Sequence, residues 1–221
     1  MKVFHLPAGL KALVFDMDLT LYTNPEYGRY QNDILVEKLG KLRGLSFEEM
    51  SCEINAARKT WSLSHSGKTS SLSNILCGFG ISIEKSVLWR NELIKPELFI
   101  KEDPVLKETL EILSNHYFLG IVTNNPVLVA RKTLAALGAD GYFSVVVGLD
   151  TCMTAKPHEI PFLKFSELSG FPCQTCVSIG DRYDVDLDIP LKLGMGGILV
   201  DGVEDVYKLP GILLKGGNYG I

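Results

Sequence analysis

Short runs of apolar residues alternate along the chain with longer stretches in which apolar residues recur every three or four positions. The short runs have the length of buried strands, and the longer stretches have the period of amphipathic helices. This pattern predicts strands over residues 11–15, 118–122, 143–148, 176–179 and 197–200. It predicts helices over residues 104–115, 126–137 and 157–169. Strands that alternate with helices indicate an α/β fold with a doubly wound, Rossmann-like parallel sheet.

The interval from Thr23 to Phe99 interrupts this alternation, because its apolar spacing is helical and it contains no convincing strand. Ser46 and Glu49 have the spacing of a capping box, which indicates the start of one helix. Further helices are expected over residues 70–78 and 84–95. We therefore predict an α/β core formed by residues 1–22 and 100–221, with a small α-helical cap domain over residues 23–99.

Composition and charge narrow the possible partners. The chain has 221 residues, 46% of them hydrophobic, and a formal net charge of −4, so it offers no basic field to attract nucleic acid or an acidic membrane. No apolar run approaches the length of a membrane span, and the first residues lack a secretory pattern. Five scattered cysteines suit a reducing compartment. We expect a cytoplasmic protein without nucleic-acid or membrane partners. The oligomeric state stays open.

Two aspartates, Asp16 and Asp18, follow the first predicted strand. Residues two apart on an extended chain can share one face. Close carboxylates raise each other's pKa unless a cation lies between them, and a hard divalent ion such as Mg²⁺ suits such oxygen ligands. The alternative is that Asp16 caps a turn while Asp18 is solvated.

Polar side chains follow the later strands as well. Thr123 and Asn124 come after the second strand, where a hydroxyl and the N–H groups of the next helix could hold an anion. Lys156 comes after the third strand and could place a cation beside a phosphate. Asp181 and Asp186 come after the fourth strand and could bind a metal ion.

Each of these positions has a simpler interpretation as a helix cap or a surface residue. A calcium loop starting at Asp184 is excluded, because Ile189 and Met195 stand where its glycine and glutamate would be. The carboxyl ends of strands in a doubly wound sheet meet at one edge, so we expect the polar residues to line a single cleft.

In these positions the chain resembles the haloacid dehalogenase superfamily of phosphohydrolases. The residues that carry the resemblance are Asp16-Met17-Asp18-Leu19-Thr20, Thr123, Lys156 and Gly180-Asp181 with Asp186. The resemblance covers roughly residues 8–22 and 100–202. It implies an Mg²⁺-dependent phosphatase that hydrolyses a small phosphate ester, such as a nucleotide, a sugar phosphate or phosphoglycolate. Many members have glycine where this chain has Leu19, and the variant resembles a subgroup that includes pyrimidine nucleotidases.

The resemblance also implies a role for each matched residue. Asp16 would attack phosphorus to form an aspartyl-phosphate, and Asp18 would protonate the leaving alcohol and later activate water. Thr123 and Lys156 would hold the phosphoryl oxygens, and Asn124, next to Thr123, is a further candidate for binding the phosphate. Four residues would serve the metal, with Asp18 doing so through its backbone carbonyl: Asp16, Asp18, Asp181 and Asp186.

Two other functions remain open at this stage. One is a phosphomutase of the same superfamily, which would have the same catalytic residues. The other is a non-catalytic phospho-aspartate signalling module, although the Asp16-x-Asp18 pair and the long helical insertion argue against it.

The predicted cap carries four candidates for substrate specificity: Arg58, Trp61, His65 and Lys68. The alternative is that the charged residues lie on a solvated face and that Trp61 packs in the core of the cap. Cys173 and Cys176 have redox spacing, but without a second pair they are predicted to be neutral thiols.

Overall fold

The computed structural model describes residues 1–65, 67 and 70–214. These residues contain a six-stranded sheet of order β1-β6-β5-β2-β3-β4. The strands are β1 (Lys2–His5), β2 (Ala12–Phe15), β3 (Phe118–Val122), β4 (Val145–Val147), β5 (Cys176–Gly180) and β6 (Gly196–Leu199). Every neighbouring pair from β6 to β4 is parallel, and β1 adds an antiparallel edge beside β6. The predicted α/β fold with a Rossmann-like parallel sheet is therefore confirmed, with β1 as an addition.

The central strand β2 is buried along its whole length. Leu13 and Phe15 pack into the apolar core on one face of the sheet, whereas Ala12 and Val14 pack into the core on the other face. Alternate side chains of a strand point to opposite faces, so a strand covered on both faces needs an uninterrupted apolar run. This explains why the run was visible in the sequence.

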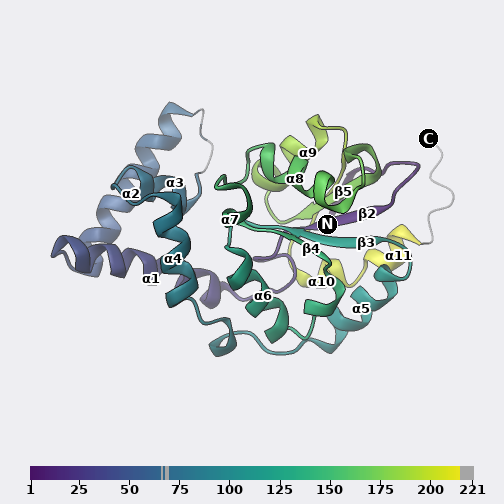
Figure 1. Cartoon of the computed structure of the whole chain (residues 1–221), viewed down its shortest axis with the longest axis horizontal. Coiled ribbons are helices and arrows are strands. Elements are labelled where there is room, and N and C mark those ends of the chain that lie inside the picture. Colours follow the sequence, from purple (N-terminus) through teal and green to yellow (C-terminus); the bar gives the residue numbers. More distant parts are fainter. Residues whose placement is uncertain (66, 68–69, 215–221) are drawn as a thin grey trace.

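Helices cover both faces of the sheet (Figure 1). One face carries α5 (Pro104–Ser114), α6 (Val127–Ala136), α10 (Val203–Val206) and α11 (Leu209–Leu213). The other carries α8 (Ile160–Ser169) and α9 (Asp188–Lys192). The short helix α7 (Leu149–Cys152) follows β4 at the end of the sheet that faces the helical insertion.

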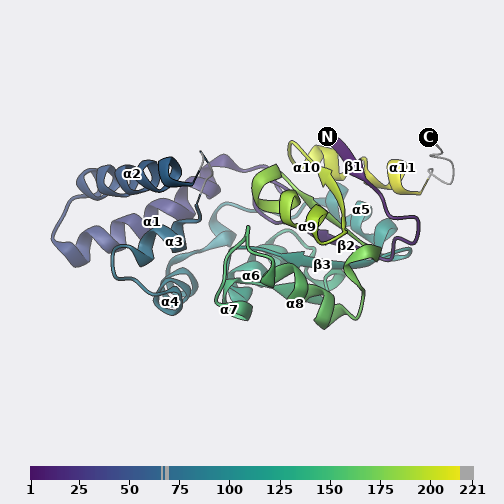
Figure 2. The same cartoon turned by 90° about the horizontal axis from the view of Figure 1, so that it is seen from above.

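In its described residues the insertion after β2 consists of helices and the turns that join them, with no strand. It contains α1 (Pro25–Arg43), α2 (Phe47–Ser64), α3 (Leu72–Cys77) and α4 (Ile83–Leu93). These helices lie to one side of the sheet in both views (Figures 1 and 2) and bury an apolar cluster of their own around Leu35, Met50 and Trp89. Asn24 caps α1, and its Nδ2 donates to the carbonyl of Phe99 at 3.0 Å. The two segments that connect the insertion to the core are thus hydrogen-bonded to each other.

The predicted helices and strands differ from the structure mainly at their ends. The expected strand over 143–148 is shortened to β4, because a 3₁₀ turn, η2 (Asp140–Tyr142), ends just before it. Helix α1 lies in the insertion that was expected to be helical, but its ends were not predicted. Strand β1 was not expected, because all four of its side chains are exposed and give no apolar pattern. No helix in the described part of the chain is long and apolar enough to cross a membrane.

Candidate active site

The carboxyl ends of three neighbouring strands bring the predicted residues together. In the register of the sheet, Phe15 of β2 lies opposite Ile121 of β3 and Ile179 of β5. The residues that follow these strands therefore emerge side by side, as the topology predicted. Asp16 leaves β2 with its backbone N–H bonded to the carbonyl of Ile179 at 2.8 Å.

Three carboxylates form an acidic cluster at this edge. One oxygen each from Asp16, Asp181 and Asp186 lies within 4.8 Å of the others. Asp186 belongs to a π-helical turn, η4 (Tyr183–Leu187), and its Oδ2 accepts from the backbone N–H of Arg182 at 3.1 Å. Gly180 allows this approach, because a Cβ at that position would lie 2.4 Å from the Cβ of Asp186.

Lys156 places its ammonium group between two of these carboxylates. Its Nζ donates to Oδ1 of Asp16 at 2.7 Å and to Oδ1 of Asp186 at 2.6 Å, and the side chain is buried. Burial alone would lower the pKa of Lys156, but the two carboxylates hold this pKa above its ordinary value. The loop of Lys156 is clamped by Asn124, which accepts from its backbone N–H at 2.7 Å and donates to its carbonyl at 3.2 Å.

The third carboxylate of the cluster, that of Asp181, has no cation at hydrogen-bond distance among the described residues. Burial, reinforced by Asp16 and Asp186, raises the pKa of Asp181 to about 7. Its Oδ1 is buried and has no hydrogen-bond partner among the described residues, and Arg182 Nε lies 3.9 Å away. An arrangement of several hard oxygen donors with too little positive charge fits a divalent cation such as Mg²⁺.

Asp18 faces a separate network of hydrogen bonds. Its Oδ1 accepts from Tyr22 Oη and from Gln31 Nε2, the latter at 2.8 Å. Its Oδ2 accepts from Asn125 Nδ2 at 2.9 Å. Burial and the nearby charge of Asp16 raise the pKa of Asp18, while the bonds from Tyr22 and Gln31 oppose that shift. The Asp18 side chain is not among the carboxylates of the acidic cluster, so its assignment to the metal stays a prediction for its backbone carbonyl.

Thr123 and Asn124 directly follow β3, at the same edge of the sheet as the cluster. Thr123 is buried, and its Oγ1 accepts from the backbone N–H of Asn125 at 3.2 Å. Both side-chain amide atoms of Asn124 bind the backbone of Lys156. Their roles toward a phosphate stay predictions.

The sequence interpretation missed three residues that contact Asp18 directly. Asn125 was detectable, because it is polar and directly follows Thr123 and Asn124 at a strand end. Tyr22 and Gln31 had no comparable signal. Gln31 is buried on α1, where it also accepts from Asn125 Nδ2 at 2.8 Å.

A cavity of about 540 Å³ lies between this edge of the sheet and the helical insertion. The core contributes Asp18, Asp181 and Arg182 to its lining. The insertion contributes several polar side chains, among them three arginines: Arg29, Arg58 and Arg90. The cavity is therefore open to a ligand that touches both the aspartates and the insertion.

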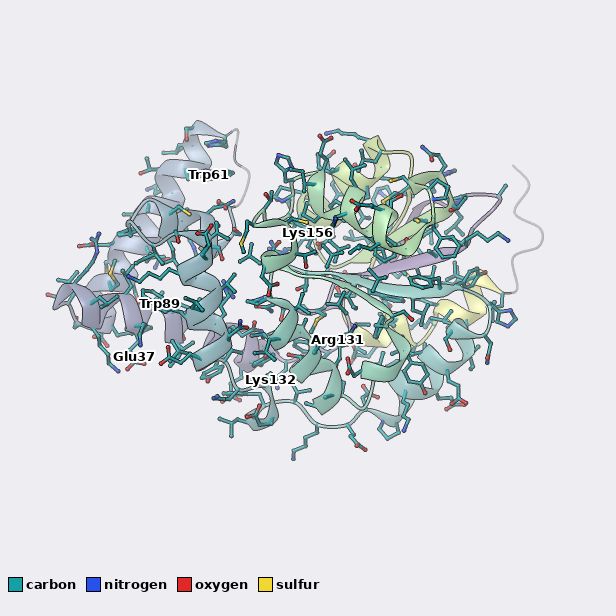
Figure 3. The ribbon with its side chains drawn as sticks, in the orientation of Figure 1. Glu37, Trp61, Trp89, Arg131, Lys132 and Lys156 are labelled. Carbon is teal, nitrogen blue, oxygen red and sulfur yellow. The ribbon has the colours of Figure 1, made fainter. Side chains whose placement is uncertain are left out.

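Of the four candidates for specificity, Arg58 lines this cavity. Trp61 and His65 stack on each other, with ring centroids 3.9 Å apart, and Trp61 lines a different cavity near Pro157. Figure 3 shows Trp61 on the insertion and Lys156 on the core. Lys68 lies outside the described residues.

Cys173 and Cys176 are buried and not bonded to each other. Burial raises the pKa of Cys176 to about 11, which keeps its thiol neutral near pH 7. This environment agrees with the predicted neutral thiol for Cys176, which stays a prediction.

Comparisons with known proteins point to one family. Residues 13–200 match the model of the haloacid dehalogenase-like hydrolases. A phosphoglycolate phosphatase of Aquifex aeolicus is 32% identical over 109 residues, which are 49% of this chain and 51% of that protein. The chain thus spans about half the length of this relative.

Solved structures show the same fold. A phosphatase from Thermococcus onnurineus aligns with a TM-score of 0.62 at 23% identity, over 96% of this chain and 100% of that chain. A β-phosphoglucomutase from Clostridium difficile aligns with a TM-score of 0.54 at 16% identity, over 92% of this chain and 99% of that chain. At these identities the likeness concerns the fold and does not choose between hydrolysis and phosphoryl transfer within a substrate.

Proposed function

The chain belongs to the haloacid dehalogenase-like hydrolase family, and we propose that it is an Mg²⁺-dependent phosphatase that hydrolyses small phosphate monoesters through an aspartyl-phosphate. The observation that carries this proposal is the acidic cluster of Asp16, Asp181 and Asp186 with Lys156 bonded to two of its members. Phosphoryl transfer requires positioning and the stabilisation of negative charge. The similarity to a phosphoglycolate phosphatase favours phosphoglycolate as a first substrate to test.

The cluster offers a site for magnesium. Asp16, Asp181 and Asp186 would hold the ion, and the unpartnered Oδ1 of Asp181 is the donor most in need of it. When bound there, Mg²⁺ would neutralise charge on the phosphoryl oxygens.

Asp16 is the proposed nucleophile. Its Oδ1 is bonded to Lys156, which fixes the carboxylate and can stabilise the charge of the phosphoryl group. The free oxygen of Asp16 would form a bond to phosphorus while the ester P–O bond breaks. The released alkoxide would take a proton from Asp18, whose raised pKa favours the protonated form.

The second step restores the enzyme. Asp18, now a carboxylate, would take a proton from a water molecule whose oxygen attacks the phosphorus of the aspartyl-phosphate. The bond between Asp16 and phosphorus breaks, and inorganic phosphate leaves. Tyr22, Gln31 and Asn125 hold the Asp18 carboxylate in place for both proton transfers.

We also propose that residues 23–99 act as a cap over a core of residues 1–22 and 100–221. The insertion has its own apolar cluster and lines the cavity over Asp18 with polar side chains. A cap of this kind can exclude water while the alcohol leaves.

Phosphate release from a panel of esters, with magnesium and with a chelator, tests the proposal. Asp16→Asn should abolish release, because an amide lacks the nucleophilic carboxylate oxygen that forms the aspartyl-phosphate. Asp188→Asn is the matched control, since Asp188 lies in the same acidic segment but pairs with Lys192 at 2.8 Å outside the cluster. Release that persists in Asp16→Asn would overturn the mechanism. Isomerisation of a sugar phosphate without net release would favour the phosphomutase.

A further inference from the structure

Arg90 carries a buried positive charge into the wall of the cavity beside Asp18. It is on α4, only 7% of its surface is exposed, and it lines the same cavity as Asp18 and Asp181. Burial lowers the pKa of Arg90 to about 10, which still leaves the guanidinium charged at neutral pH. The cavity wall thus holds a cation that water reaches poorly.

Among the described residues this guanidinium forms no ion pair, and the one carboxylate whose charge acts on it, that of Asp18, is not directly bonded to it. Nη1 donates to Asn125 Oδ1 at 3.1 Å and Nη2 donates to Ser73 Oγ at 3.5 Å, and both acceptors are neutral. Nε is buried and has no hydrogen-bond partner among the described residues.

Other arginines of the described chain do form ion pairs: Arg43, Arg131 and Arg182. Arg90 is not among them. A buried charge is ordinarily paired, because its desolvation is otherwise uncompensated. A ligand anion in the cavity would supply the missing partner.

Asn125 connects the guanidinium of Arg90 to the carboxylate of Asp18 through hydrogen bonds. Its Oδ1 accepts from Arg90, while its Nδ2 donates to Oδ2 of Asp18. In the proposed function Asp18 faces the oxygen of the leaving alcohol. A substituent on that alcohol would therefore extend toward Arg90.

We propose that Arg90 binds a carboxylate on the alcohol portion of the substrate, so that this enzyme selects short phosphate esters that carry a second, carboxylate charge. The inference rests on the proposed function for the orientation of the ester. A planar carboxylate can accept two parallel N–H bonds from one guanidinium, and Arg90 gives two of its five N–H groups to other residues that the structure describes.

The test compares two esters of equal length. Phosphoglycolate carries the carboxylate, and 2-hydroxyethyl phosphate has a neutral hydroxymethyl group in its place. Arg90→Gln should lower kcat/KM for phosphoglycolate by about 10- to 100-fold, the range of a charge-assisted hydrogen bond, and leave that for 2-hydroxyethyl phosphate nearly unchanged. Arg90→Lys should recover part of the loss. Lys38→Gln removes an insertion cation paired with Glu92 outside the cavity and should change neither ester.

An equal loss on both esters would overturn the inference, since Arg90 would then act only on Asp18 through Asn125. Binding to Asp16→Asn with magnesium, measured by calorimetry, separates this inference from the proposed function because it needs no turnover. Phosphoglycolate should bind more tightly than 2-hydroxyethyl phosphate, and the added Arg90→Gln change should remove the difference. Equal affinities, or no binding of either ester, would overturn it. Tighter binding of ethylene glycol bisphosphate than of phosphoglycolate would overturn the choice of a carboxylate as the group that Arg90 binds.

Discussion

The ammonium nitrogen of Lys156 lies 2.7 Å from Oδ1 of Asp16, and both side chains are almost fully buried. The same nitrogen lies 2.6 Å from Oδ1 of Asp186. One cation therefore balances two buried carboxylates, and the carboxylate of Asp181 lies beside them. The lysine thus links two members of this acidic cluster, and in the proposed function it would also stabilise the phosphoryl group.

Lys156→Met should destabilise the protein, because it leaves buried carboxylates without their cation. Loss of one partner of a buried ion pair costs about 3–5 kcal/mol. Magnesium should restore part of this free energy of unfolding by supplying positive charge at the same place. Urea unfolding with magnesium and with a chelator measures both effects.

Lys192→Met is the control for that experiment. Lys192 is 64% exposed and pairs with Asp188 at 2.8 Å, so its removal should cost less than about 1 kcal/mol. If Lys156→Met were no less stable than Lys192→Met, or indifferent to magnesium, the electrostatic account of the cluster would be wrong.

Gln31→Met should slow the hydrolysis of alkyl phosphates by about 10- to 100-fold, which is part of the rate enhancement that general acid–base catalysis supplies. The change removes the donor at 2.8 Å from Oδ1 of Asp18 and the acceptor of the bond from Asn125. The value of kcat/KM for p-nitrophenyl phosphate should fall much less, because its leaving group needs little protonation and kcat/KM reports only the steps up to the departure of the leaving group. Steady-state rates on both esters measure the difference.

The matched control is Gln174→Met, which alters an exposed glutamine in the 3₁₀ turn η3 (Cys173–Thr175). It should leave both rates unchanged. Equal losses on the two esters in Gln31→Met would point to a general distortion of the site and contradict a role in positioning Asp18.

The sequence predicted those parts of the fold whose apolar pattern is set by burial on both faces, as in β2 and β5. It could not reveal β1, because an edge strand with four exposed side chains has no such pattern. Asp16 and Asp181 were found because strand ends converge in any doubly wound sheet. Gln31 and Arg90 could not be found, since their contacts depend on how α1 and α4 pack over that edge, which helical periodicity does not encode.

Gly180→Ala should weaken magnesium binding by about 10- to 100-fold, as changes that reorient metal ligands do. The new Cβ would lie 2.4 Å from the Cβ of Asp186, so this side chain must move from the position in which it shares the cluster with Asp16 and Asp181. Titration calorimetry with Mg²⁺ measures the affinity. Gly141→Ala is the control, because a Cβ there would meet no atom within 4 Å. Unchanged affinity in Gly180→Ala would argue against Asp186 as part of the metal site.

Leu19 occupies a left-handed backbone conformation, with φ of 59°, at the position where the resembled family often has glycine. A side chain in this region lowers the stability by about 1–2 kcal/mol relative to glycine. Glycine itself lowers the stability by about 0.5–1 kcal/mol, because it raises the entropy of the unfolded chain. Leu19→Gly should therefore be more stable than Leu19→Ala by up to about 1.5 kcal/mol. Both variants remove the same partly exposed side chain, and alanine retains the Cβ that causes the strain. Urea unfolding of the pair measures the difference, and a Leu19→Ala variant as stable as Leu19→Gly would show that the local backbone relaxes at no cost.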